Sequence, residues 1–276
     1  MKNTLTLVVM LCASVYITSC SKSSTSHPVA PTPQPTIVDT FVAAAGITDS
    51  LQVHALNNFV GALKQSSLWS KFIAIYPMVG GSANSAKWNL KDPRDMDEAY
   101  RLTLHGSPEV ADSGIFFPTI ADYADTHIVD SVLPYNNNSI SYYSSTQNQI
   151  SGYDMGCSDT VHPNNEFAIY SQLDATEWFG YHAFGIQPAT TKGLFIMTAT
   201  ATDVERYDNS VLTGSKGSAP VQAYTNLPIL LGNVSADGLC GQRVCALATV
   251  GSGLSAQDVA AFYQIVQSFQ ADLKRN

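Results

Sequence analysis

Residues 243–270 read RVCALATVGSGLSAQDVAAFYQIVQSFQ, and this stretch contains signals for both kinds of regular structure. Its first eight residues, 243–250, are rich in apolar and β-branched side chains and predict a strand. Ser255 follows, and Asp258 stands three residues later, where the two can form a capping box at the start of a helix. Apolar side chains then recur at helical spacing. The stretch therefore predicts a strand that leads through a short turn into a C-terminal helix.

Short strand-like segments, separated by turn residues, continue this pattern toward the N-terminus. Each segment holds β-branched or aromatic side chains, and Gly, Pro, Asn, Asp or Ser stands between them. A helical period is lacking here, so a parallel sheet with helical crossovers is not expected. Segments at this spacing predict a sandwich or a barrel. The expected strands are 72–79, 99–104, 139–144, 166–172, 178–184, 193–200, 203–208, 227–231 and 243–250.

A second helix is predicted on the N-terminal side of these strands. Asp49 can cap it, with Gln52 at the capping-box position. Its apolar face is formed by Leu51, Ala55, Leu56, Phe59, Val60 and Leu63. We therefore expect one mainly β domain over residues 37–276, in which an N-terminal and a C-terminal helix bracket a β-sandwich.

Composition and charge exclude several classes of protein. Charged residues make up only 13% of the chain, hydrophobic residues make up 45%, and the net charge is −8 with a pI near 5.0. A disordered chain would need less hydrophobicity and more charge. A nucleic-acid-binding surface would need a basic stripe to neutralise phosphates. We therefore expect a folded protein that does not bind nucleic acid.

The N-terminus resembles the signal of a bacterial lipoprotein. Lys2 precedes a short apolar run over residues 5–16, which is too short to span a bilayer comfortably. The run ends in Ile17-Thr18-Ser19-Cys20, which resembles a lipobox. The resemblance implies that residues 1–19 are removed and that Cys20 is lipidated, so that lipid anchors the chain to a membrane. The alternative is an ordinary secretory signal with a chance cysteine.

A tether is expected to follow the lipidated cysteine. Residues 20–36 are rich in Ser and Thr and then in Pro, a composition that cannot build a core. No acidic residue stands close behind Cys20, so signals for inner-membrane retention or acidic surface export are missing. We therefore expect an outer-membrane lipoprotein of the cell envelope, and the sequence does not choose between its periplasmic and surface faces.

The mature chain would keep three cysteines, Cys157, Cys240 and Cys245. Cys240 and Cys245 flank four residues and could form a disulfide across the end of a hairpin. The alternative is two small buried thiols. A cysteine pair at this spacing without further Cys or His partners is a weak metal signal. We expect no metal site and no cofactor.

The common catalytic motifs are missing from the sequence. There is no G-x-S-x-G, H-E-x-x-H, P-loop or G-x-G-x-x-G segment. The five glutamates do not form the paired pattern of jelly-roll glycosidases. The acidic cluster over residues 92–98 is either a cation site or, as we expect, a turn paired internally with Arg94. His162 is interpreted as a loop residue. No catalytic residue is predicted, although two carboxylates from distant strands could still meet.

The richest aromatic stretch covers residues 177–182 and includes Trp178 and Tyr181. Sugars stack their apolar faces on such rings, so both side chains are candidate ligand-binding residues. The alternative is that they belong to the core of the sandwich. On a strand, the two would point to opposite faces.

Several ordered motifs resemble those of a group of largely uncharacterised proteins from Bacteroidota and from phages. The resemblance covers about a third of the chain and implies a concanavalin A-like (laminin-G-like) jelly-roll domain between two helices. It implies no catalytic residue. The motifs are LNNFV (56–60), LWSKF (68–72), AIYP (74–77), VGG (79–81), KWNLKDPRD (87–95), YADT (123–126), RVCA (243–246), GSGLS (251–255), FY (262–263) and VQSFQ (266–270).

These observations lead to one functional hypothesis and two alternatives. The main hypothesis is a lipid-anchored, non-enzymatic β-sandwich module of the cell envelope that binds glycans. The first alternative is a structural or adhesion domain that contacts protein, as a component of a phage particle would. The second is a glycan-active hydrolase or lyase with an unusual pair of carboxylates. The sequence identifies no protein partner.

Overall fold

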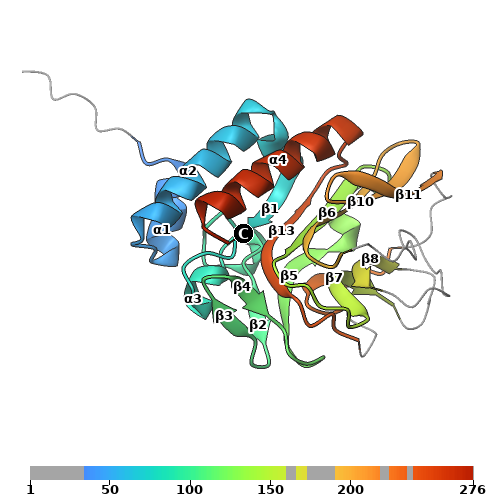
Figure 1. The fold of residues 1–276 in the computed structure, drawn as a ribbon, viewed down its shortest axis with the longest axis horizontal. Helices are drawn as coiled ribbons and strands as arrows, with labels where there is room; N and C mark the ends of the chain where they lie inside the picture. Colours follow the sequence, from blue (N-terminus) through green and yellow to red (C-terminus); the bar gives the residue numbers. More distant parts are fainter. Residues whose placement is uncertain (1–33, 160–165, 173–189, 218–223, 235–238, 276) are drawn as a thin grey trace, which may run out of the picture. The chain divides into compact units, whose positions relative to one another are not determined.

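Two antiparallel sheets pack face to face in the computed structural model of this chain, which describes residues 34–159, 166–172, 190–217, 224–234 and 239–275. Within these residues the larger sheet has eight strands and the smaller sheet has five. The mainly β sandwich expected from the sequence is therefore confirmed. Figure 1 shows the ribbon.

The larger sheet is organised around β13 (Val244–Gly251), which pairs with three other strands. Its order is β11 (Val211–Gly217), β10 (Asp203–Asp208), β9 (Gly193–Ala199), β6 (Asn138–Ser144), β13, β4 (Gly114–Phe116) and β3 (Glu109–Ala111), with β1 (Phe72–Tyr76) also paired to β13.

The smaller sheet places β5 and β7 on either side of β12. Its order is β2 (Thr103–His105), β5 (Tyr123–Val129), β12 (Pro228–Leu231), β7 (Gly152–Ser158) and β8 (Glu166–Gln172). In the pairing of β2 with β5, His105 lies opposite Tyr123 and Thr103 lies opposite Asp125. This register fixes which side chains share the outer face of the sheet.

The core of the sandwich is built from the inward side chains of both sheets. Phe195 and Met197 of β9 belong to it from the larger sheet, and Met155, Phe167 and Ile169 belong to it from the smaller one. Alternate residues of a strand point to opposite faces, so the neighbours of these side chains face outward. On the larger sheet, those outward side chains are also buried.

Helices cover the outer face of the larger sheet. The rings of Phe59 and Phe269 stack with centroids 4.4 Å apart, and Phe262 packs 4.9 Å from Phe72 of β1. Ile196 of β9 belongs to the same buried cluster. Figure 1 shows α2 and α4 lying side by side on this side of the sandwich. The helices are α1 (Ile37–Ala45), α2 (Ser50–Gln65), α3 (Ala83–Ala86) and α4 (Ala256–Asp272), with 3₁₀ helices η1 (Leu68–Lys71), η2 (Asp97–Ala99) and η3 (Asp130–Val132).

The capping box predicted for the C-terminal helix is confirmed, whereas the one predicted for α2 is not formed. Ser255 and Asp258 form the predicted capping box of α4. Asp49 caps α2, but Gln52 does not complete a box, because its Oε1 accepts a hydrogen bond from Gly80 N at 2.8 Å. Helix α1 was not predicted from the sequence. Its signal was the capping box that Thr36 forms with Asp39.

Most strands of the larger sheet lie where the sequence places them, and several others do not. The predictions for β1, β6, β8, β9, β10, β12 and β13 are confirmed within a few residues. The expected strand at 99–104 was placed too early, because Tyr100 has a φ of 58° and β2 begins at Thr103. The expected strand at 178–184 lies outside the described residues. Strands β3, β4, β5, β7 and β11 were not predicted.

The candidate disulfide does not form in this structure, and its alternative is found, since Cys240 and Cys245 are both buried thiols that do not pair. The physical reason is that the segment does not form a hairpin end. Cys245 lies on β13 in the core of the sandwich, and burial raises the pKa of its thiol. Cys240 instead forms an isolated parallel bridge with Tyr153, and its Sγ lies 3.9 Å from Phe117 O.

The predicted signal peptide, the predicted lipidation site Cys20 and almost all of the expected tether lie outside the described residues. Within the described part of the chain, we find no helix with the length and apolar character needed to cross a bilayer.

Candidate functional site

The two outer faces of the sandwich differ in how they are covered. Burial on β5 alternates along the whole strand, so its outward residues Tyr123, Asp125 and His127 are partly exposed. No helix of the described chain belongs to the buried cluster on this side, which consists of Tyr153, Ala168 and Val234 with Tyr170 beside them. The outer face of the smaller sheet is therefore accessible along β5.

A pocket of about 360 Å³ lies on this face, and we call it the sheet pocket. This volume falls within the range of small-molecule sites. Its described lining consists of Ile120, Tyr123, Asp125, Pro228, Leu230, Asn233 and Val234.

An aromatic stack, which we call the platform, contributes one of its two rings, Tyr123, to the lining of the sheet pocket. The ring of Tyr123 stacks on the ring of His105, with centroids 4.4 Å apart and planes 13° from parallel. The stack follows from the register of β2 and β5, which sets the two residues opposite each other. It holds the phenol in one orientation beside the pocket. A ring held in this way can receive the apolar face of a flat or ring-shaped ligand.

A carboxylate stands beside this platform. Asp125 lies two residues after Tyr123 on the same face of β5, and its Oδ1 accepts a hydrogen bond from His127 N at 2.7 Å. His127 has a φ of 57°, a conformation that costs a non-glycine residue about 1–3 kcal/mol. Its ring is held by Thr103, with 2.7 Å between Nε2 and Oγ1. The pocket therefore joins a stacking surface to a hydrogen-bond acceptor.

The turn before β5 is fixed by a second carboxylate that points into the protein. Hydrogen bonds from the Thr119 side chain and from Ser107 N hold the pKa of the Asp122 carboxyl below its ordinary value. Asn233 Nδ2 also donates to Ile120 O at 2.7 Å. These contacts position Ile120, whose side chain is 51% exposed.

A second pocket, of about 350 Å³, adjoins the first, and Ile120 lines both. We call it the end pocket. Its described lining is Pro118, Thr119, Ile120, Ile150, Ser151, Leu239, Cys240 and Gln242. The side chains of Ile150 and Leu239 are 42% and 49% exposed. The two pockets therefore adjoin at Ile120, and the end pocket adds apolar lining to the more polar lining of the sheet pocket.

A buried ion pair supports the wall of the end pocket. Arg243 Nε donates to Asp154 Oδ1 at 2.7 Å, and both side chains are almost completely buried. The same guanidinium donates to the carbonyl oxygens of Asn148, Ile150 and Gly152. Arg243 thereby fixes the segment that carries Ile150 and Ser151 into the pocket.

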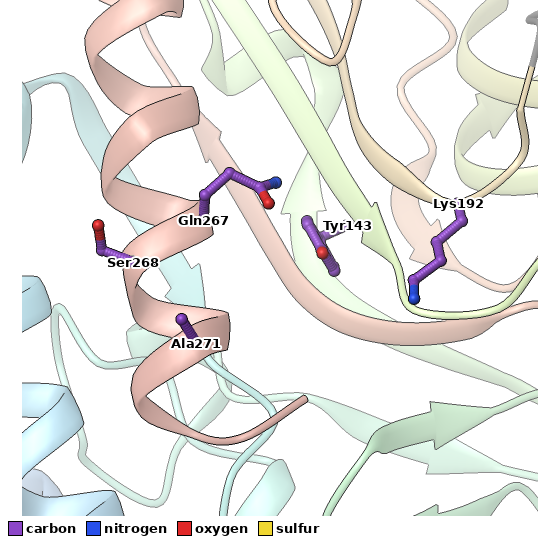
Figure 2. Close-up of a pocket in the computed structure, with 5 residues that line it drawn as sticks. All are labelled: Tyr143, Lys192, Gln267, Ser268 and Ala271. Atoms are coloured by element: carbon purple, nitrogen blue, oxygen red, sulfur yellow. The ribbon is translucent and has the colours of Figure 1, made fainter. Parts of the chain in front are cut away.

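A third pocket, of about 530 Å³, lies between α4 and the larger sheet, and we call it the helix-side pocket. Figure 2 shows Gln267 reaching from α4 toward Tyr143 of β6, with Lys192 on the other side of the tyrosine. Burial raises the pKa of Tyr143, although its hydrogen bond with Gln267 acts in the opposite direction. The described lining of this pocket offers neither an exposed ring face nor a carboxylate. It is the weaker candidate for ligand binding.

The sequence predicted few of these site residues. Trp178, Tyr181 and His162 lie outside the described residues, so their predicted roles stay predictions. Cys240 lines the end pocket as a thiol, and Cys245 does not line it. Tyr123 and Asp125 were missed as site residues. The alternation in residues 123–129 (YADTHIV) could have placed Tyr123 and Asp125 on one face.

The expected internal pair of the acidic cluster over residues 92–98 forms between Arg94 and Asp92, and the other pairs use basic residues outside the cluster. Arg94 forms an ion pair with Asp92, and Lys87 Nζ lies 2.9 Å from Asp95 Oδ2. Asp97 forms an ion pair with Arg101. Among the described residues no group of His, Cys, Asp and Glu side chains could hold a metal ion.

No protein-family model and no curated protein sequence matches this chain. Solved structures are similar to it. Domain 4 of the extracellular arabinanase AbnA from Geobacillus stearothermophilus, in complex with arabinotriose, has a TM-score of 0.48 at 15% identity, covering 70% of this chain and 98% of that one. The binding domain of botulinum neurotoxin serotype G has a TM-score of 0.43 at 12% identity, covering 71% and 51%. With scores and identities this low, the likenesses say nothing about what this chain binds.

Proposed function

We propose that this chain is a lipid-anchored, non-enzymatic module of the bacterial cell envelope that binds glycans at the sheet pocket. The observation that carries the proposal is the Tyr123–His105 stack beside the carboxylate of Asp125. The stack offers a flat apolar surface, and the carboxylate accepts hydrogen bonds from hydroxyl groups. A sugar ring presents both an apolar face and hydroxyls, so it matches both parts of the pocket.

The non-enzymatic part of the proposal rests on the carboxylates. Glycosidases use two carboxyl groups on either side of the bond that they cleave. Among its described residues, the lining of the sheet pocket has one, Asp125. The carboxylate of Asp122, the nearest acidic residue in the sequence, is already bonded to Ser107 and Thr119.

The anchor and the location rest on the sequence. Ile17-Thr18-Ser19-Cys20 supports lipidation at Cys20, and the Pro-rich tether would hold the sandwich away from the outer membrane. The ordered motifs that end in VQSFQ (266–270) support membership of the Bacteroidota and phage group with concanavalin A-like jelly rolls.

A protein-contact function is the second candidate. It is favoured by one observation, the three exposed apolar side chains Ile120, Ile150 and Leu239 around the end pocket. Grouped exposed apolar side chains are typical of interaction surfaces.

The test is glycan-array binding of the full-length protein, followed by calorimetry on each ligand found. Tyr123→Ala should weaken binding roughly tenfold or more, because an aromatic contact is worth on the order of 1.4 kcal/mol. Ser268→Ala, in the helix-side pocket, is the matched control and should bind as the unsubstituted protein does. Loss of binding in Ser268→Ala alone would move the site to the helix-side pocket. A blank array from folded protein would favour the protein-contact function.

A further inference from the structure

The sheet pocket and the end pocket offer different chemistry to a single ligand. Because Ile120 lines both, the two pockets are neighbours, and a ligand seated on Tyr123 that passes over Ile120 would reach the end pocket. The end pocket is lined by Pro118, Ile150 and Leu239 in addition to Ile120. Binding that uses both pockets therefore needs a polar ring with an apolar substituent.

The charges around the sheet pocket and the end pocket determine which sugar rings can bind there. Asp125 lines the sheet pocket, and Asp122 lies in the turn that carries Ile120. No lysine or arginine occurs among the described residues that line either pocket. The buried guanidinium of Arg243 is already paired with Asp154. A sugar that carries a carboxylate would meet like charge here, so an uncharged sugar is favoured.

The end pocket also supplies polar groups that can bond an amide. Gln242 lines it and has a φ of 48°, a strained conformation that is found at ligand clamps. Ser151 adds a hydroxyl. An acetamido group combines an amide with a methyl group, and these would contact the polar and apolar parts of this lining.

We propose that the ligand is an uncharged glycan with N-acetyl groups, whose sugar ring stacks on Tyr123 and whose acetamido group enters the end pocket beside Ile150 and Leu239. This inference rests on the proposed glycan-binding function and adds the substrate class.

The test is calorimetry of the full-length protein with three oligosaccharides of the same length. They are a β-1,4 trimer of N-acetylglucosamine, a β-1,4 trimer of glucose, and a trimer that contains glucuronic acid. We expect the acetylated trimer to bind roughly tenfold more tightly than the glucose trimer, the discrimination that a small apolar group gives in an apolar pocket. The uronic trimer should bind more weakly than both. Equal affinities, or tightest binding of the uronic trimer, would overturn the inference and leave glycan binding intact. An array without any bound glycan would instead overturn the proposed function itself.

A variant separates the end pocket from the rest of the site. Leu239→Asn changes an exposed side chain, so the fold should tolerate it. It should remove the roughly tenfold preference for the acetylated trimer and leave the affinity for the glucose trimer unchanged. Val211→Asn, at an exposed apolar position on the edge strand β11, is the matched control and should keep the preference. If Leu239→Asn also keeps it, the acetamido group does not enter the end pocket.

Discussion

The outer face of the larger sheet, which we call the covered face, differs from the outer face of the smaller sheet, which we call the open face, in how its side chains are buried. On the larger sheet, the strands β6 and β9 are buried along their whole length, because α2 and α4 cover their outward side chains. On the smaller sheet, β5 alternates between buried and partly exposed residues. The difference teaches that side chains buried on both faces serve stability here, whereas a half-covered strand can present Tyr123 and Asp125 to a ligand.

The covered face should respond most strongly to substitution. Phe269→Ala removes a completely buried ring that stacks on Phe59, and we expect it to lower the free energy of unfolding by about 3–5 kcal/mol. Urea unfolding measures the loss, and Phe269→Leu is the control, with an expected loss of about 1 kcal/mol. The affinity of the folded protein for glycans should not change. A loss below about 1 kcal/mol for Phe269→Ala would mean that the helix does not stabilise the sheet.

Loss of the ion pair between Arg243 and Asp154, beneath the end pocket, should have the next largest effect on stability. Arg243→Met removes the guanidinium that pairs with the buried carboxylate of Asp154, and we expect a loss of about 3 kcal/mol in stability. The double variant Arg243→Met/Asp154→Leu should recover part of this loss, because an apolar pair buries no charge. Both are measured by urea unfolding. If the double variant is no more stable than Arg243→Met, the charge of Asp154 is not the cause of the loss.

Acid should destabilise the turn before β5 through Asp122. Its folded pKa lies below the ordinary value, so the carboxylate stabilises the fold above pH 3.8, and this contribution is lost as the pH falls through the folded pKa. Asp122→Asn should therefore lower stability by about 1–2 kcal/mol at pH 7 and make little difference in strong acid. Urea unfolding across this pH range checks it.

The exposed carboxyl of β3 supplies the control for the acid experiment. Glu109→Gln changes an exposed residue and should alter stability by less than about 0.5 kcal/mol at pH 7. A constant difference between Asp122→Asn and the unsubstituted protein at every pH would contradict the ionic role of Asp122.

The covered face was largely predictable from the sequence, and the open face was not. Helix α4 was found from Ser255, Asp258 and the apolar stripe that ends at Phe269, because burial against a sheet leaves a regular pattern. Strand β5 was missed because Asp125 and His127 interrupt its apolar residues, and β-propensity alone does not find such a segment.

The candidate site was missed for a different reason. The sheet pocket joins a turn at Ile120, strand β5 and the segment Asn233–Val234, which are brought together only by the pairing of β5 with β12. No local pattern contains that information. Because aromatic residues are concentrated around Trp178, the sequence analysis predicted the ligand-binding site there, in a segment outside the described residues.

The central place of β13 determines when this chain can fold. This strand is near the C-terminus, yet it joins β1 (Phe72–Tyr76) to β6 (Asn138–Ser144) in the middle of the larger sheet. Contacts between residues so distant in sequence slow folding. The larger sheet therefore cannot complete its pairing before residues 244–251 are available, so the joining of β1 to β6 through β13 is a late step in folding.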